Sequence, residues 1–307
     1  MGQNEVARIC DPGGKIGCQH ESYGSIRAAR VSAHLMQFAS LNGVTVHYQL
    51  IGAPEKRPLI VFVNSLGTDF RIWRDVVVRL AGEYAILLYD KRGHGLSEVG
   101  RTPYAMATLA DDLAALIEHV GGRRAVICGV SVGGMIAQQL YARRRDLVDG
   151  LILCDTLARI GDAAFWDARI AAIEANGLAA VAGEILQRWF TPAFRRPQNS
   201  AYAGYRTMFE RQPQDGYVAT CVALRECDLT ALVPGIRVPT MCVVGDQDGS
   251  TPPPLVKAFA GAIDGAGFAM IEDCGHLPSI EQPEALTGIL RGFLSSLAAE
   301  KVSHVSH

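Results

Sequence analysis

The chain has 307 residues, of which 49% are hydrophobic and 20% charged, with a formal net charge of −2 at pH 7. The hydrophobic content allows one large folded domain with an insertion. The slightly negative net charge predicts no basic surface that would bind nucleic acids or anionic membranes. We therefore expect no nucleic-acid partner and no membrane partner, and the sequence leaves a homo-oligomer open.

Residues 1–35 are expected to form a poorly ordered extension. They are rich in Gly, Ser and charged residues and lack the apolar segment of a secretory signal. Glu5, Asp11 and Glu21 argue against an organellar transit peptide. No later run reaches the roughly 18 uncharged apolar residues that a membrane span requires. A cytoplasmic location is the resulting expectation.

The eight cysteines are scattered, without C-x-x-C pairs or the spacing of cysteine and histidine in zinc sites. Cys128, Cys154 and Cys242 each fall inside an apolar run, where cysteine behaves as a small hydrophobic residue. We expect reduced thiols and no metal site.

From residue 44 onward, short apolar runs alternate with segments of helical periodicity. The runs predicted as strands are VTVHYQL (44–50), LIVFV (59–63), AILLYD (85–90), AVICGV (125–130), LILCDT (151–156), TMCVVGD (240–246) and FAMIED (268–273). Runs this apolar are typical of strands buried on both faces. Between two of them, apolar residues recur at helical spacing over 106–120. The alternation predicts an α/β fold with a mostly parallel central sheet flanked by helices.

The alternation stops after residue 155 and resumes near residue 238. The interval contains AAFWDARIAAIEANGLAAVAGEILQRWF (163–190), which is helical in composition and pattern. We therefore expect a helical cap at 156–235, inserted into a core formed by 36–155 and 236–300, with a short tail at 301–307.

The stretch CGVSVGGMIAQ (128–138) places Ser131 between Gly129 and Gly133, in the spacing G-x-S-x-G. A predicted strand precedes it and a predicted helix follows, which is the context of the nucleophile elbow of α/β-hydrolases. Glycines permit the tight turn that exposes the serine, and the helix directs its N-terminal dipole at developing negative charge. Ser131 is the candidate nucleophile.

A serine hydroxyl needs a neighbouring base, and the base needs a carboxylate to orient it. Of the eight histidines, His276 is the candidate, because it lies just beyond the last predicted strand. The rival is His94, which precedes the elbow and is expected to stabilise its own glycine turn.

Three aspartates follow predicted strands and are candidates for the acid. The usual α/β-hydrolase pattern favours Asp248, in the loop after the strand that precedes the histidine strand. Asp246 would then brace the turn, and Asp155 is the alternative acid.

Acyl transfer also needs donors for a tetrahedral oxyanion. The backbone N–H of Val132, next after the serine, is one candidate, and the N–H of Leu66 in VNSLGTDF (63–70) is the second. Losing one such donor costs on the order of 3 kcal/mol of transition-state stabilisation.

The motifs NSLGTDFRIW, YDKRGHGLS, CGVSVGGMIAQ, IGDAAFWDARI, RWFTPAF, GYVATC and VVGDQDGSTPP together resemble the 3-oxoadipate enol-lactonase family, over about residues 36 to 298. The resemblance implies hydrolysis of 3-oxoadipate enol-lactone to 3-oxoadipate, in the breakdown of aromatic compounds by the β-ketoadipate pathway. It assigns the triad to Ser131, Asp248 and His276 and the oxyanion hole to Leu66 and Val132.

This small-molecule substrate carries a carboxylate, so we expect a cation near it. Arg188 and Arg71 are the candidates, with Trp166 and Trp189 as further substrate contacts. Because an enol is a good leaving group, no cofactor is expected.

Two other functions stay open. One is a carboxylesterase or a carbon–carbon bond hydrolase of the same fold. The other is a ligand-sensing receptor that keeps an intact triad but acts through a change in cap shape.

Overall fold

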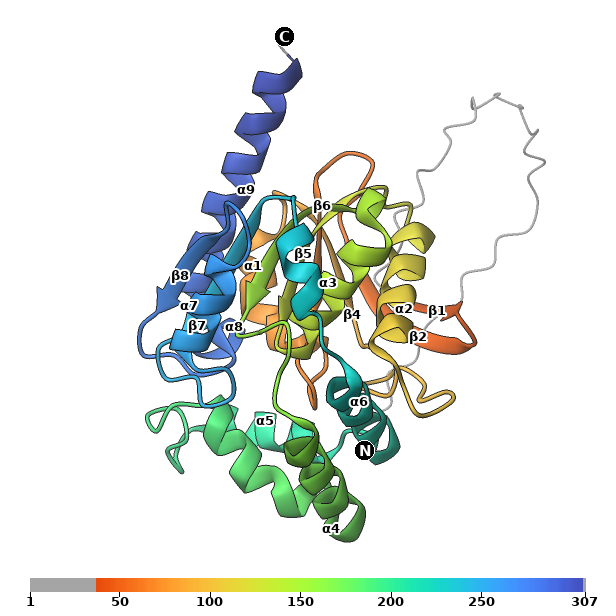
Figure 1. Ribbon diagram of the computed structural model, residues 1–307, viewed down its shortest axis with the longest axis vertical. Coiled ribbons are helices and arrows are strands. Elements are labelled where there is room, and N and C mark those ends of the chain that lie inside the picture. The colour runs from red at the N-terminus through yellow and green to blue at the C-terminus, as the bar shows by residue number, and fades with distance from the viewer. Residues whose placement is uncertain (1–36, 306–307) are drawn as a thin grey trace, which may run out of the picture. The chain divides into compact units, whose positions relative to one another are not determined.

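The structure, a computed structural model, describes residues 37–305 (Figure 1). The predicted N-terminal extension therefore lies outside the described residues. The described residues all belong to one compact unit.

The described chain contains an eight-stranded sheet in the order β1-β2-β4-β3-β5-β6-β7-β8. The strands are β1 (Gln37–Leu41), β2 (Val44–Ile51), β3 (Leu59–Val63), β4 (Ala85–Tyr89), β5 (Ala125–Val130), β6 (Val148–Cys154), β7 (Thr240–Gly245) and β8 (Gly267–Ile271). β2 pairs antiparallel with β1 and with β4, and the pairs from β4 to β8 are parallel. This confirms the predicted mostly parallel sheet.

One strand was not among the predicted runs. β1 forms a hairpin with β2 through Asn42 and Gly43, whose φ angles of 48° and 77° are both left-handed. Asn-Gly is the preferred pair for such a two-residue loop, because both positions need positive φ. The hairpin adds an antiparallel edge to the parallel sheet.

Helices cover the sheet and extend beyond one end of it. They are α1 (Arg74–Leu80), α2 (Met106–His119), α3 (Val132–Arg143), α4 (Ala163–Trp189), α5 (Ser200–Glu210), α6 (Gln214–Glu226), α7 (Pro253–Gly261), α8 (Pro278–Glu281) and α9 (Pro283–Val305), with 3₁₀ turns η1 (Phe70–Trp73), η2 (Arg145–Leu147) and η3 (Thr230–Gly235). Among these, α1 packs against α9 and α2 against α3. α9 includes residues 301–305 of the predicted tail.

The helices α4, α5 and α6 come between β6 and β7 and gather at the lower end of Figure 1. α4 packs against both α5 and α6. It is broken at Gly177, whose φ of 76° and ψ of 169° are not helical. The exact boundaries of a cap domain stay a prediction.

The core is centred on the middle strands of the sheet. Every residue of β3, β4 and β5 is buried, as expected for strands covered on both faces. The six cysteines of the described residues are free and buried within this packing.

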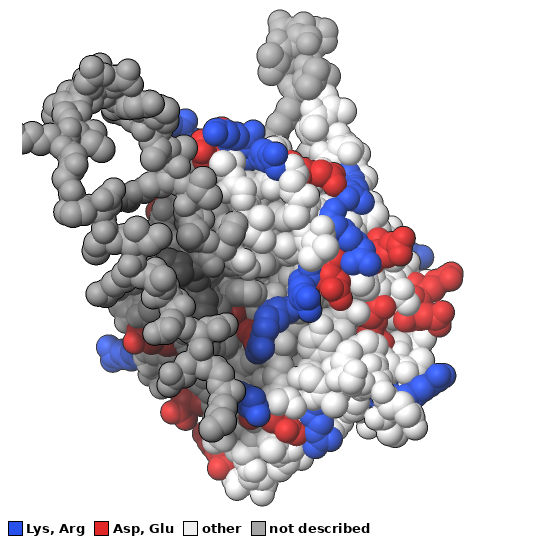
Figure 2. Space-filling view, turned by 180° about the vertical axis from the view of Figure 1, so that it is seen from behind, with Lys and Arg blue, Asp and Glu red and all other residues white. Residues whose placement is uncertain are grey.

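No helix among the described residues is long and apolar enough to cross a membrane. On the uncovered part of the face in Figure 2, acidic and basic side chains lie next to each other.

Candidate active site

Ser131 occupies a strained turn between β5 and α3. Its φ of 59° and ψ of −123° lie where L-residues are rarely found, and it is 9% exposed. Its N–H donates to the Cys154 carbonyl at 3.0 Å, and Thr156 Oγ1 donates to its carbonyl at 2.7 Å. A Cβ on Gly133 would collide with the Val63 carbonyl, so this position needs glycine. The β5–α3 junction therefore has the predicted elbow geometry.

His276 and Asp248 form a buried pair. His276 Nδ1 lies 2.9 Å from Asp248 Oδ2, and both side chains are almost fully enclosed. Asp248 also accepts hydrogen bonds from Thr251 Oγ1 at 2.5 Å and from the Ser250 N–H at 2.7 Å. Burial by itself would raise the pKa of Asp248, but the imidazole and these donors outweigh it and hold the pKa below its ordinary value. The charged form of Asp248 is thus stabilised beside the imidazole.

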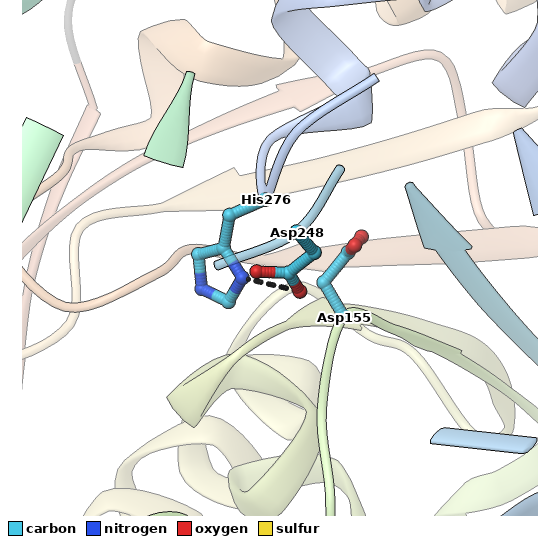
Figure 3. Close-up of side chains that lie close together, drawn as sticks. All are labelled: Asp155, Asp248 and His276. Carbon is cyan, nitrogen blue, oxygen red and sulfur yellow. Dashed lines mark hydrogen bonds and ion pairs between the residues drawn. The ribbon is translucent and has the colours of Figure 1, made fainter. Parts of the chain in front are cut away.

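Asp155 lies at the end of β6, close to this pair (Figure 3). Its Oδ1 accepts from the Gly245 N–H at 2.9 Å, whereas its buried Oδ2 has no partner among the described residues. Burial raises the pKa of Asp155 well above its usual value, and the charge of Asp248 adds to the effect. The third aspartate, Asp246, accepts from the Cys274 N–H at 3.0 Å, so it braces the turn.

Asp155, Asp248 and His276 could in principle hold a metal ion, because one ligand atom from each lies within 4.8 Å of the others. Their bonding fits another role. The imidazole nitrogen nearest the acids already bonds to Asp248, and burial favours the neutral form of Asp155. Metals bind ionised carboxylates and free imidazole nitrogens, so the cluster fits a hydrogen-bonded acid and base better than a metal centre.

Ser131 and His276 line the same pocket, which encloses about 140 Å³. The other lining residues are Ser65, Leu66, Ile160, Gly161, Phe165, Trp166, Arg169, Arg188, Trp189, Leu224 and Ser250. Of the predicted substrate contacts, Trp166, Arg188 and Trp189 are therefore at the pocket. α4 contributes five of the lining residues, and the others come from loops and from α6.

Arg71 is not brought to the pocket. Its guanidinium makes two bonds to Asp69, at 2.6 and 2.9 Å, and its side chain is 68% exposed. Arg188 lines the pocket but pairs with Glu184 one turn earlier, at 2.5 Å. Of the two arginines predicted to bind the substrate carboxylate, only Arg188 therefore lines the pocket, and it already has an acidic partner.

A third arginine, Arg169, was not among the predicted site residues. It lines the pocket, with its guanidinium carbon 4.7 Å from the Phe165 ring centroid and 5.5 Å from that of Trp166. It forms no ion pair with the acidic residues in the described part of the chain. The sequence does contain a signal for it, because a residue three positions after Trp166 shares its side of a helix.

The loop after β3 brings Leu66 to the pocket. Two side chains from the loop after β4 hydrogen-bond to this loop after β3. These contacts were not predicted from the sequence. Lys91 Nζ donates to the Ser65 carbonyl at 2.6 Å, and His94 Nε2 accepts from the Gly67 N–H at 3.1 Å. His94 also faces the Arg92 carbonyl of its own turn, at 3.4 Å. The rival histidine therefore supports the Leu66 loop as well as its own turn.

Val132 is the first residue of α3, directly after Ser131. The first N–H groups of a helix have no partner within it, so this N–H is free of the helical hydrogen-bond pattern. The Leu66 N–H makes no hydrogen bond with the described residues. Both N–H groups are thus available to an oxyanion.

Comparison with known proteins gives a consistent result. The family model described as "Alpha/beta hydrolase family" matches residues 60–288. The chain is 32% identical over 265 residues to "3-oxoadipate enol-lactonase 1" of Acinetobacter baylyi, which covers 86% of this chain and 98% of that protein.

Solved structures agree with this comparison. The enol-lactonase from Burkholderia xenovorans is 35% identical, with a TM-score of 0.81 over 84% of this chain and all of that chain. A thermophilic esterase from Thermogutta terrifontis is 29% identical, with a TM-score of 0.79 over 85% of this chain and 97% of that chain. Lactonases and esterases thus share this fold at similar levels of identity.

Proposed function

Since this chain belongs to the alpha/beta hydrolase family, we propose that it is a serine hydrolase that opens the ring of 3-oxoadipate enol-lactone to give 3-oxoadipate. The observation that carries the proposal is the pocket in which Ser131 and His276 meet Arg169, an arginine without an acidic partner in the described chain. A nucleophile, a base and a cation around one small cavity suit a lactone that carries a carboxylate.

The hydrogen bond to Asp248 sets the tautomer of the base. With Nδ1–H donating to Asp248, His276 Nε2 is free to accept the proton of Ser131 Oγ. The serine oxygen then bonds to the lactone carbonyl carbon, and the N–H groups of Leu66 and Val132 hold the resulting oxyanion. The ring C–O bond breaks, and the enol oxygen leaves with the proton that His276 returns.

The second half of the cycle releases the acid. A water molecule gives its proton to His276 and bonds to the acyl carbon, and the bond to Ser131 Oγ breaks as the serine regains a proton. The released enol tautomerises to the ketone. The sum is one lactone and one water giving one oxo acid, with no redox change and no cofactor.

The part of the pocket lined by arginine would receive the substrate carboxylate. Arg169 is the better candidate for this contact, because Arg188 already pairs with Glu184. Trp166 and Trp189 would then pack against the ring of the substrate. The lactone is the only partner that this proposal needs.

Ser131→Ala tests the nucleophile. We expect loss of nearly all hydrolysis with little change in folding, because the side chain removed makes no hydrogen bond with the described residues. The measurement follows the ultraviolet absorbance of freshly generated enol-lactone. The exposed Ser40→Ala serves as the matched control and should keep full activity. A folded, fully active Ser131→Ala protein would exclude the proposed mechanism.

A carboxylesterase is the second candidate, supported by the similarity to the thermophilic esterase. The same pocket and the same three residues would then act on an open-chain ester. Substrate profiling separates the two candidates. Faster turnover of simple aryl esters than of enol-lactone, at matched concentration, would favour the esterase.

A further inference from the structure

The peptide group between Ser65 and Leu66 joins the proposed oxyanion donor to a buried charge. Its N–H is the Leu66 donor, and its carbonyl oxygen accepts from Lys91 Nζ at 2.6 Å and from Thr68 Oγ1 at 2.9 Å. Lys91 is 2% exposed, although lysine is almost never fully buried without a partner. A buried ammonium thus lies behind the loop that lines the pocket.

A charge on the carbonyl oxygen acts on the N–H of the same peptide. The peptide bond is a resonance unit, so drawing electron density towards oxygen makes the N–H more positive. Hydrogen bonds from a charged donor are roughly twice as strong as neutral ones, and burial keeps water from screening the charge. We propose that Lys91 is a positioning residue that strengthens the Leu66 N–H as an oxyanion donor.

The acids near Lys91 are bonded to other groups, so its ammonium group donates to the Ser65 carbonyl. It faces the carboxylates of Asp90 and Asp69 and the imidazole of His94. The Asp90 oxygens accept from His47 Nδ1 and from backbone N–H groups, and those of Asp69 bond to Arg71. Among the described residues, the hydrogen bond to Ser65 is the one that Nζ makes.

The charge is present only in part of the accessible pH range. Burial lowers the pKa of Lys91 to about 7, although Asp90 and Asp69 oppose the shift. His94 carries no competing charge there, because burial and then Lys91 lower its pKa well below the usual value. The Leu66 donor should therefore weaken as the pH rises above about 7 and Lys91 loses its proton.

The inference rests on the proposed serine mechanism but not on the lactone, so the test uses p-nitrophenyl acetate. Lys91→Met removes both charge and donor, and Lys91→Gln keeps an N–H donor without the charge. We expect kcat to fall by about tenfold or more in both variants with KM within about twofold, since the lost interaction belongs to the transition state. The exposed Lys257→Met is the matched control and should keep the wild-type kcat.

Two further readouts separate charge from support of the fold. The wild-type kcat should decline from about pH 7 to pH 9, and this decline should be absent in the Lys91 variants. Inhibition by phenylboronic acid, which forms a tetrahedral adduct with a serine, should weaken in parallel with kcat.

A folded Lys91→Gln protein with wild-type kcat, or with a change in KM alone, would overturn the inference. If neither variant folds, a flat wild-type kcat between pH 7 and 9 would overturn it as well. Activity that survives Ser131→Ala would instead refute the proposed function, so the two failures can be told apart.

Discussion

Asp155 and Asp248 lie close together, yet their surroundings shift their pKa values in opposite directions. Asp248 accepts hydrogen bonds from an imidazole, a hydroxyl and backbone N–H groups, which stabilise its ionised form. Asp155 has one backbone donor and an unpartnered oxygen in the same enclosed space. Two adjacent carboxyl groups avoid sharing a negative charge by keeping one protonated. The acid that pairs with His276 is therefore Asp248, and Asp155 is the neighbour whose neutral form is favoured.

Replacing each aspartate by asparagine tests this division. We expect Asp248→Asn to lower kcat by about 10³- to 10⁴-fold, because the imidazole loses the partner that fixes its tautomer. Asp155→Asn should change kcat by less than about fivefold, because the amide is neutral like the protonated acid and keeps the acceptor for Gly245. Steady-state kinetics at pH 7 measure both. A larger loss for Asp155→Asn than for Asp248→Asn would reverse the assignment.

Residues differ in how well the sequence predicts their place. The turn at Ser131 could be predicted, because only small neighbours fit the strained backbone that the spacing specifies. Asp248 could be preferred, but its advantage over Asp155 depends on donors that the fold assembles, such as Thr251. The role of Lys91 could not be predicted, because it depends on which carbonyl the end of a long side chain reaches in space.

At the level of elements, the end of α4 is bonded directly to both loops that carry the acid and the base. The His276 N–H donates to the Trp189 carbonyl at 2.8 Å, and the Gly249 N–H donates to the Arg188 carbonyl at 3.2 Å. Glu281 of α8 adds a third connection. It accepts from Thr191 Oγ1 at 2.7 Å and from the Gly275 N–H at 2.9 Å.

Glu281→Ala tests whether this connection matters. The change leaves buried donors of Thr191 and Gly275 without a partner, so we expect a loss of about 1–3 kcal/mol in unfolding free energy. A lower kcat should accompany it, because Gly275 precedes His276. Chemical denaturation and steady-state kinetics measure these effects, with the exposed Glu284→Ala as the control. Equal stability and activity in the two variants would contradict the role given to Glu281.

The elements themselves were predictable to different degrees. The central strands β3, β4 and β5 begin where predicted, because burial on both faces makes them continuously apolar. β1 escaped prediction because it is an edge strand with mixed burial, and its clearest signal is the Asn42–Gly43 pair that follows it. The helical pattern of 163–190 predicted α4 but not its break at Gly177.

Across the whole molecule, buried titratable groups couple stability to pH. Burial holds the pKa of His94 well below its usual value of about 6.5. Below about pH 6.5, the unfolded chain therefore binds a proton at His94 that the folded chain does not bind. Stability from this group is thus present above about pH 6.5 and is lost as the pH falls. Asp155 has the opposite sign, since its raised pKa costs stability once the unfolded chain ionises above about pH 4.

His94→Gln should remove the loss of stability that His94 causes at acidic pH, while it keeps an acceptor for the Gly67 N–H. Below about pH 6.5, wild-type unfolding free energy should fall relative to this variant by up to about 1.4 kcal/mol per pH unit, the value for one proton. Urea denaturation at several pH values between 5 and 7.5 measures the difference. The exposed His119→Gln should follow the wild type. A His94→Gln protein with the wild-type slope would contradict the assignment.

The break at Gly177 divides the part of the pocket wall formed by α4 into two halves. Substitutions should be tolerated differently in these two halves. The second half of α4 ends at Trp189 and is tied to the catalytic loops, so changes there would also disturb the chemistry. The first half carries Trp166 and Arg169 and joins the second half through a non-helical residue. Selection for a new substrate could therefore remodel the first half and leave the reaction machinery intact.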